Sequence, residues 1–127
     1  MSRAIVLDAG ALIAVERRSP QLQELVRTAR ARNVSLVVPT VVLAQVVRSG
    51  GRQVQLRRFL ADSYLRFVNL DYPTALRIGA LLGETGTADV ADAAVVVCAR
   101  ELALAPVITS DPEDLRKLDA TVPLIVL

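Results

Sequence analysis

Two carboxylates begin the most apolar helical segment of this sequence. Asp89 and Asp92 are three residues apart, so on a helix they share a face, one turn apart. Residues 93–98 are Ala, Ala, Val, Val, Val and Cys, a composition that predicts a helix packed inside the protein. Like charges at this spacing repel each other. The helix N-terminus, a cation, or both must therefore offset the charge of the pair.

Two further acids follow segments that are predicted to be strands. Asp8 comes directly after the apolar run 3–7, and Asp111 follows the run 106–109. In a parallel α/β sheet both would stand at the carboxyl edge of the strands, where such folds bind ligands. Each acid alone also has a structural explanation, because Asp8 and Asp111 are suited to cap a helix and Asp89 to complement a helix dipole.

Asp92 is harder to explain by structure alone. It lies one turn inside an apolar helix, where an unpaired charge is costly. The sequence has no histidine and a single cysteine, Cys98, which excludes a structural zinc site, a Ser-His-Asp triad and a Cys-His nucleophile. We interpret Cys98 as a small buried hydrophobic residue. A metal ion here would have oxygen ligands, which favours Mg²⁺ or Mn²⁺.

The elements that carry these acids predict an α/β fold. Of the 127 residues 53% are hydrophobic and four are aromatic, so the core must consist of Val, Leu, Ile and Ala, as in a buried parallel sheet. The predicted strands cover residues 3–7, 34–38, 65–70, 106–109 and 122–127. The predicted helices cover residues 11–18, 21–32, 40 to a break at 49–51, 53–61, 72–83, 87–100 and a segment that starts at 110–115. This alternation predicts one domain over 1–127, a three-layer α/β/α sandwich with a mostly parallel central sheet.

The cellular location of the protein is predicted from the absence of long apolar segments in the sequence. No run reaches 18 apolar residues without a charge, a proline or a polar break, and residues 1–3 lead directly into the first strand. We therefore expect a cytoplasmic protein without a membrane partner. A net charge of +2 is too small to identify a nucleic-acid partner by itself.

The acids also carry a resemblance to a known family. Asp8, the run Asp-Val-Ala-Asp-Ala at 89–93 and the run Thr-Ser-Asp at 109–111 occur in an order and context that resemble a PIN domain. More narrowly, the whole chain resembles the VapC toxins of type II toxin–antitoxin pairs. This implies an endoribonuclease that depends on Mg²⁺ or Mn²⁺, is inhibited by a VapB-like antitoxin and forms a homodimer. It also implies that Asp8, Asp92 and Asp111 bind the metal, with Asp89 as a further candidate.

One position departs from the family pattern. PIN domains usually have a glutamate on the helix after the second strand, where this sequence has Gln45. An amide brings no negative charge, so metal affinity should fall and a second metal is in doubt. Glu16 or Glu84 could supply a replacement carboxylate, although each is also explained as a solvated charge at a helix end. The alternative function is a catalytically weak PIN protein that acts by binding its antitoxin or RNA.

The hypothesis that follows is hydrolysis of an RNA phosphodiester by a metal-activated water. Asp8 and Asp92 would be direct ligands, Asp111 a ligand or an orienting group, and Gln45 a polar positioning residue. An apolar groove between the early helices would receive an antitoxin helix. Six further residues are candidates for contacts with RNA, with a solvated helix face or a satisfied turn hydroxyl as the alternative explanation: Arg17, Arg18, Arg48, Arg52, Thr109 and Ser110.

Overall fold

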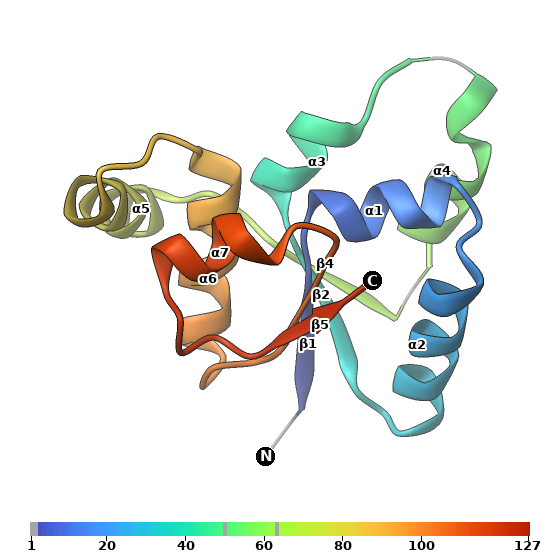
Figure 1. Ribbon diagram of the computed structural model, residues 1–127. Coiled ribbons are helices and arrows are strands. Elements are labelled where there is room, and N and C mark those ends of the chain that lie inside the picture. Colours follow the sequence, from blue (N-terminus) through green and yellow to red (C-terminus); the bar gives the residue numbers. More distant parts are fainter. Residues whose placement is uncertain (1–2, 50, 63) are drawn as a thin grey trace.

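A computed structural model describes residues 3–49, 51–62 and 64–127 of the protein (Figure 1). The strands are β1 (Ala4–Leu7), β2 (Ser35–Pro39), β3 (Leu65–Val68), β4 (Val107–Thr109) and β5 (Leu124–Val126). The helices are α1 (Ala9–Glu16), α2 (Pro20–Ala31), α3 (Thr40–Val46), the 3₁₀ turn η1 (Gly51–Gln53), α4 (Val54–Leu60), α5 (Tyr72–Thr85), α6 (Val90–Glu101) and α7 (Pro112–Leu118). The predicted break at 49–51 includes Gly50, which lies outside the described residues.

The five strands form one sheet with the order β3-β2-β1-β4-β5, and each neighbouring pair is parallel. The predicted three-layer sandwich with a parallel central sheet is confirmed. From β1 the chain first winds outward through β2 and β3, then returns to the other side of β1 to form β4 and β5. The strand order therefore reverses between β1 and β4, which is the place where open α/β sheets bind ligands.

Helices cover both faces of the sheet (Figure 1). α1, α2 and α4 pack together on one face, while α6 packs on β1 and β2 from the other and carries α5 and α7 beside it. α3 contacts both α1 and α6 near the carboxyl edge of the sheet. Of the helices in the described ranges, none has the length and apolar character that crossing a membrane requires.

The core consists of aliphatic side chains, as the composition predicts. Val6, Leu7, Val37 and Val38 of the central strands are fully buried. In α6, residues 93–99 are all buried, which confirms that this helix is packed inside the protein. The burial of this helix places its polar N-terminus at the carboxyl edge of the sheet.

The observed helix starts differ from the predicted ones where a side chain caps the helix. Asp8 and Asp89 lie directly before α1 and α6, so α1 starts two residues earlier than predicted and α6 about three residues later. The predicted helix 53–61 corresponds to α4, and the 3₁₀ turn η1 precedes it. The buried amide of Gln53 accepts from Arg48 N–H at 2.7 Å and donates to the Val46 carbonyl at 2.9 Å. The end of α3 is thereby tied to η1.

Candidate functional site

Asp8 stands at the end of β1 and caps α1. Its carboxylate accepts a hydrogen bond from Ala11 N–H at 2.9 Å, and its own N–H bonds to the Ile108 carbonyl of β4 at 3.3 Å. Only 5% of the residue is exposed. Burial raises the pKa of Asp8 above its ordinary value, although hydrogen bonds from Thr109 and the backbone oppose the rise. The capping explanation is confirmed, and it leaves a buried acid beside the switch point of the sheet.

Thr109 connects Asp8 to Asp111. Its hydroxyl oxygen accepts from Asp111 N–H at 3.0 Å, and the hydroxyl also hydrogen-bonds to the Asp8 carboxylate. Thr109 is fully buried and its hydroxyl is enclosed beside the two acids, so contact of this side chain with RNA stays a prediction that its burial disfavours. Asp111 does not cap α7 with its side chain, and it is exposed at the same rim. Its carboxylate is therefore available to a ligand.

Because the Thr109 hydroxyl bonds to both acids, replacing Thr109 with valine, which has a similar shape, should change the stability of the protein and the pKa of Asp8. Thr109→Val removes the hydroxyl, so Asp8 loses a donor and Asp111 N–H loses its acceptor. We expect the free energy of unfolding to fall by about 1–3 kcal/mol and the pKa of Asp8 to rise further. Urea denaturation and carboxyl NMR titration measure the two effects. Thr109→Ser is the matched control, and a Val variant that behaves like this Ser variant would contradict the bridge.

Asp92 lies in the first turn of α6, close to the other acids. The Asp89 carboxylate accepts from Asp92 N–H at 2.9 Å, which is an N-cap bond. Partial burial raises the pKa of Asp92 to about 6, and the negative charges of Asp89, Asp114, Asp8 and Asp111 raise it as well. Acids from three parts of the chain therefore act on one carboxyl group, as the positions at the strand ends predicted.

Asp114 is a further member of this cluster, which the sequence pattern did not identify as a site residue. It lies in the first turn of α7 and lines a cavity of about 180 Å³ together with Asp89, Asp92 and Lys117. The Lys117 Nζ is 3.9 Å from an Asp114 carboxylate oxygen, and both side chains are more than half exposed. The spacing of three residues from Asp111 to Asp114 repeats that from Asp89 to Asp92, but an ordinary acid in the first turn of a helix has the same spacing.

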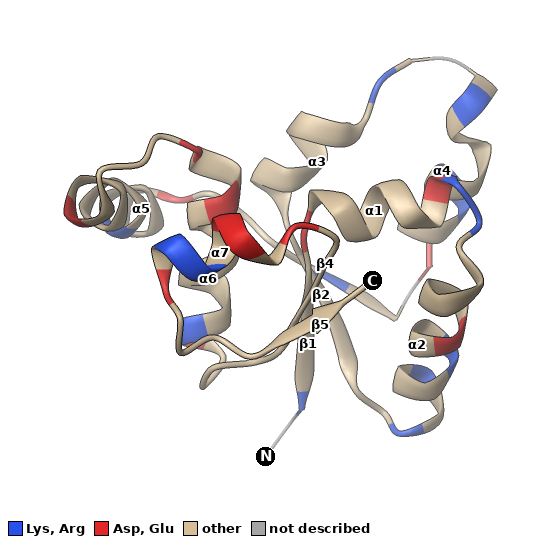
Figure 2. Ribbon diagram, viewed as in Figure 1, with Lys and Arg blue, Asp and Glu red and all other residues tan. Residues whose placement is uncertain are grey.

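The cluster contains carboxylate oxygens, which are suitable ligands for a hard divalent cation, but these oxygens are not arranged around a common metal position. Figure 2 shows acidic residues gathered where α1, α6 and α7 begin. Within the described residues, Asp8, Asp89, Asp92 and Asp111 form no ion pair with Lys or Arg. In the same ranges no three acidic side chains stand close enough together to hold a metal ion as they are placed. Carboxylate oxygens fit Mg²⁺ or Mn²⁺, and side-chain rotation would have to complete the site.

A groove of about 500 Å³ lies between α1 and α3 and contains Gln45; we call it the Gln45 groove. Its lining residues are Ala9, Ile13, Glu16, Arg17, Gln45, Val46 and Arg48. Of the two candidates for a replacement carboxylate, Glu16 borders this groove. Glu84 instead lines a cavity between α5 and α6 together with Arg77 and Arg100. Glu16 is therefore the acid that shares a surface with Gln45.

The four arginines that were predicted to contact RNA are divided by the fold. Arg17 and Arg48 line the Gln45 groove. Arg18 lines a different groove, and Arg52 is exposed in η1. Ser110 is exposed beside Asp111 and faces Gly10, where a Cβ atom would lie 2.1 Å from the Ser110 hydroxyl oxygen. A glycine at position 10 thus allows the start of α1 to approach the turn after β4.

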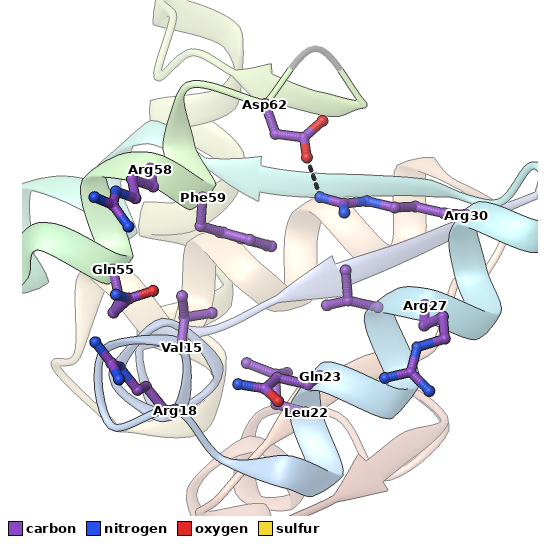
Figure 3. Close-up of a pocket in the computed structure, with 11 residues that line it drawn as sticks. Val15, Arg18, Leu22, Gln23, Arg27, Arg30, Gln55, Arg58, Phe59 and Asp62 are labelled. Atoms are coloured by element: carbon purple, nitrogen blue, oxygen red, sulfur yellow. Dashed lines mark hydrogen bonds and ion pairs between the residues drawn. The ribbon is translucent and has the colours of Figure 1, made fainter.

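A second groove, which we call the arginine groove, has a volume of about 520 Å³ and lies among α1, α2 and α4 (Figure 3). The half-buried side chains of Val15 and Phe59 supply an apolar surface, and the buried Leu22 packs behind it. Four arginines surround that surface: Arg18, Arg27, Arg30 and Arg58. Arg30 forms an ion pair with Asp62 and lies 5.6 Å from the ring centroid of Tyr64. The early helices thus form a groove, but it differs from the apolar groove that was predicted, because polar and charged side chains make up most of its lining.

The geometry defines a class of protein: an α/β fold in which acids from three segments of the chain lie at the switch point of the sheet. The family model of the PIN domain matches residues 5–120, so this chain belongs to the PIN domain family. No curated protein matches the sequence.

Solved structures with the same fold include toxin–antitoxin proteins. VapBC2 from Rickettsia felis, bound to a promoter DNA fragment, is similar with a TM-score of 0.74 and 18% identity over 98% of both chains. A toxin–antitoxin complex from Klebsiella pneumoniae has a TM-score of 0.69 and 19% identity over 96% of both chains. FitAcB from Neisseria gonorrhoeae has a TM-score of 0.64 and 18% identity, over 95% of this chain and 96% of the other.

Proposed function

We propose that this protein is a Mg²⁺- or Mn²⁺-dependent endoribonuclease, the toxin of a type II toxin–antitoxin pair. The observation that carries the proposal is the convergence of Asp8, Asp92 and Asp111 at the switch point without a basic partner in the described residues. An uncompensated cluster of carboxylates is costly unless it binds a cation. Membership of the PIN family and the fold shared with toxin–antitoxin proteins support the proposal.

The residues would divide the work by their positions. Asp8, Asp92 and Asp111 would hold the cation, with Asp89 and Asp114 beside them. When held by these carboxylates, Mg²⁺ or Mn²⁺ would supply positive charge for the phosphate and would lower the pKa of a water molecule that acts as the nucleophile. Thr109 keeps Asp8 and Asp111 together. The exposed amide of Gln45 and the guanidinium groups of Arg17 and Arg48, which line the same groove, would position the RNA strand.

Direct titration with Mn²⁺ tests the metal-binding part of the proposal. Calorimetry of the antitoxin-free protein should show binding that Asp111→Asn weakens by at least about tenfold, since a carboxylate contributes charge that an amide lacks. Asp111 is suited to this test because its side chain caps no helix. Equal Mn²⁺ affinity of the Asn variant and the wild type would remove Asp111 from the proposed ligands.

The proposed partner is a VapB-like antitoxin, and the arginine groove is the surface that suits it. An amphipathic helix binds such a groove by its apolar face. Acidic residues at its margins would complement Arg18 and Arg58, because Arg27 and Arg30 already pair with Glu24 and Asp62. The similar structure from Klebsiella pneumoniae, a toxin–antitoxin complex, supports a partner of this kind. Sequestration of RNA or antitoxin by a catalytically weak protein remains the second candidate, because Gln45 brings no charge.

Phe59 gives the most specific prediction for the antitoxin. Phe59→Ala truncates the aromatic side chain in the arginine groove, and we expect the affinity for the cognate antitoxin to fall at least about tenfold. Calorimetric titration measures the affinity, and the release of RNA cleavage from inhibition should follow it. Phe67→Ala, at an exposed phenylalanine of the edge strand β3 outside the arginine groove, is the matched control. Unchanged affinity of the Phe59 variant would place the antitoxin on another surface.

The homodimer stays a prediction. The described surface of α5 exposes Tyr72 and Leu76, one turn apart, with 77% and 58% of each residue accessible. A second copy of the chain would bury this apolar pair. Light scattering of the wild type and a Leu76→Asp variant tests the assembly.

A further inference from the structure

The Gln45 groove leads away from the acid cluster along α1. Helices α1 and α3 begin at the carboxyl ends of the neighbouring strands β1 and β2 and pack against each other. Ala9 follows Asp8 directly and lines one end of the groove, and Glu16 at the last residue of α1 lines the other. Eight residues of helix separate Asp8 from Glu16 by about 12 Å. Glu16 is therefore displaced along α1 from the acid cluster, at a distance where it could contact a nucleotide other than the one that is cleaved.

The groove presents the groups that recognise a nucleobase. Glu16 offers a carboxylate that forms no ion pair within the described residues, although Arg17 and Arg48 line the same groove. Gln45 offers an exposed amide, and the half-buried Ile13 offers an apolar surface for a ring. Single-stranded RNA is read in this way, by stacking and by hydrogen bonds to the edges of unpaired bases.

Arg48 is held in place at the rim of this groove. Its Nη1 atom donates to the carbonyl oxygens of Val47 at 2.8 Å and Ala44 at 3.1 Å, at the end of α3. A guanidinium group fixed in this way keeps other N–H donors and a planar face for a phosphate or a base. The acceptor groups of the groove are thus flanked by positive charge that suits an RNA backbone.

We propose that Glu16 is a specificity-determining residue that reads a guanine of the RNA substrate, an inference that rests on the proposed nuclease function. An ionised carboxylate only accepts hydrogen bonds, and it does so with two oxygens. Guanine presents two adjacent donors, N1–H and the N2 amino group. Adenine and cytosine place a ring-nitrogen acceptor beside the amino group, and the single N–H of uracil lies between two carbonyl oxygens. Glu16 therefore matches guanine alone, and the Gln45 amide can donate to its O6 atom.

Binding without cleavage tests this inference directly. Fluorescence anisotropy in EDTA would compare eight-nucleotide oligoadenylates that carry G, A, C, U or inosine at one central position. We expect G to bind roughly tenfold tighter than A, C or U, and inosine, which lacks the N2 amino group, to lose most of that gain. Glu16→Gln should remove the preference for G, whereas the control Glu24→Gln on the surface of α2 should retain it.

A cleavage assay on an RNA of mixed sequence separates this inference from the proposed function. Cleavage next to guanine by the wild type, and without that preference by Glu16→Gln, supports both. Cleavage without any guanine preference, or with a preference that Glu16→Gln retains, overturns the inference and leaves the nuclease. Glu16-dependent binding of guanine without cleavage supports the inference and contradicts the nuclease. Loss of all cleavage in Glu16→Gln with unchanged guanine binding also overturns it, and assigns Glu16 to the acid cluster.

Discussion

Asp92→Asn is expected to lower metal-dependent RNA cleavage at least about a hundredfold, which corresponds to about 3 kcal/mol of transition-state stabilisation. The reason is the position of Asp92 among the other acids, four of which raise its pKa. The amide has nearly the same size as the carboxylate but brings no charge to a cation. The main-chain N–H of residue 92 still bonds to the Asp89 cap, so α6 keeps its start.

Initial rates of cleavage of a fluorescent RNA in Mg²⁺ measure this effect. Glu24→Gln is the control, because Glu24 is an exposed carboxylate whose ion pair with Arg27 lies on the surface of α2. The circular dichroism spectra of both variants should match that of the wild type. Cleavage by Asp92→Asn within a few-fold of the wild-type rate would exclude Asp92 from the metal site.

The same substitution is expected to stabilise the protein when no metal is present. The pKa of Asp92 is raised to about 6 in the folded protein from 3.8, chiefly by burial. Between pH 4 and pH 6 the folded state therefore binds more protons than the unfolded state, so stability falls as the pH rises through this window and stays lower above it. The asparagine variant resembles the protonated acid and avoids this loss. We expect a gain of about 1 kcal/mol at pH 8, after allowance for partial solvent exposure.

Chemical denaturation in EDTA at pH 4 and at pH 8 measures the gain, which should be present at pH 8 and nearly absent at pH 4. Addition of Mn²⁺ at pH 8 should reverse the order, because a ligand that binds only the folded state stabilises it. The wild type should then gain stability and Asp92→Asn should gain much less. A variant that is less stable than the wild type in EDTA at pH 8 would contradict the account of an uncompensated charge.

The sequence predicted the acids at the rim because strand ends of a parallel sheet share one edge. Asp8 and Asp111 each follow an apolar strand, and this pattern was enough to bring them together. Their exact meeting place depended on the strand order, which puts β1 beside β4, and no local pattern encodes that order. The strand order thus places these two acids on adjacent strands, at the switch point of the sheet.

Other features of the site could not be predicted from local patterns. Asp114 has the spacing of an ordinary acid in the first turn of a helix, so only the packing of α7 against α6 reveals it as part of the cluster. Thr109 ends a strand, and a turn hydroxyl at such a place is usually exposed. Its complete burial follows from the contact of α1 with β4. The Gln45 groove likewise exists only because α1 and α3 pack together.

Whether this protein is a metal-dependent ribonuclease can be measured by cleavage of total RNA by the antitoxin-free protein, with Mg²⁺ or Mn²⁺ in one set of reactions and EDTA in the other. The account predicts RNA fragments in the presence of either ion, none in EDTA, and recovery when the ion is restored. Such a result would also show that Gln45 is compatible with catalysis. A folded protein that leaves RNA intact in both ions, or that cuts equally well in EDTA, would contradict the account.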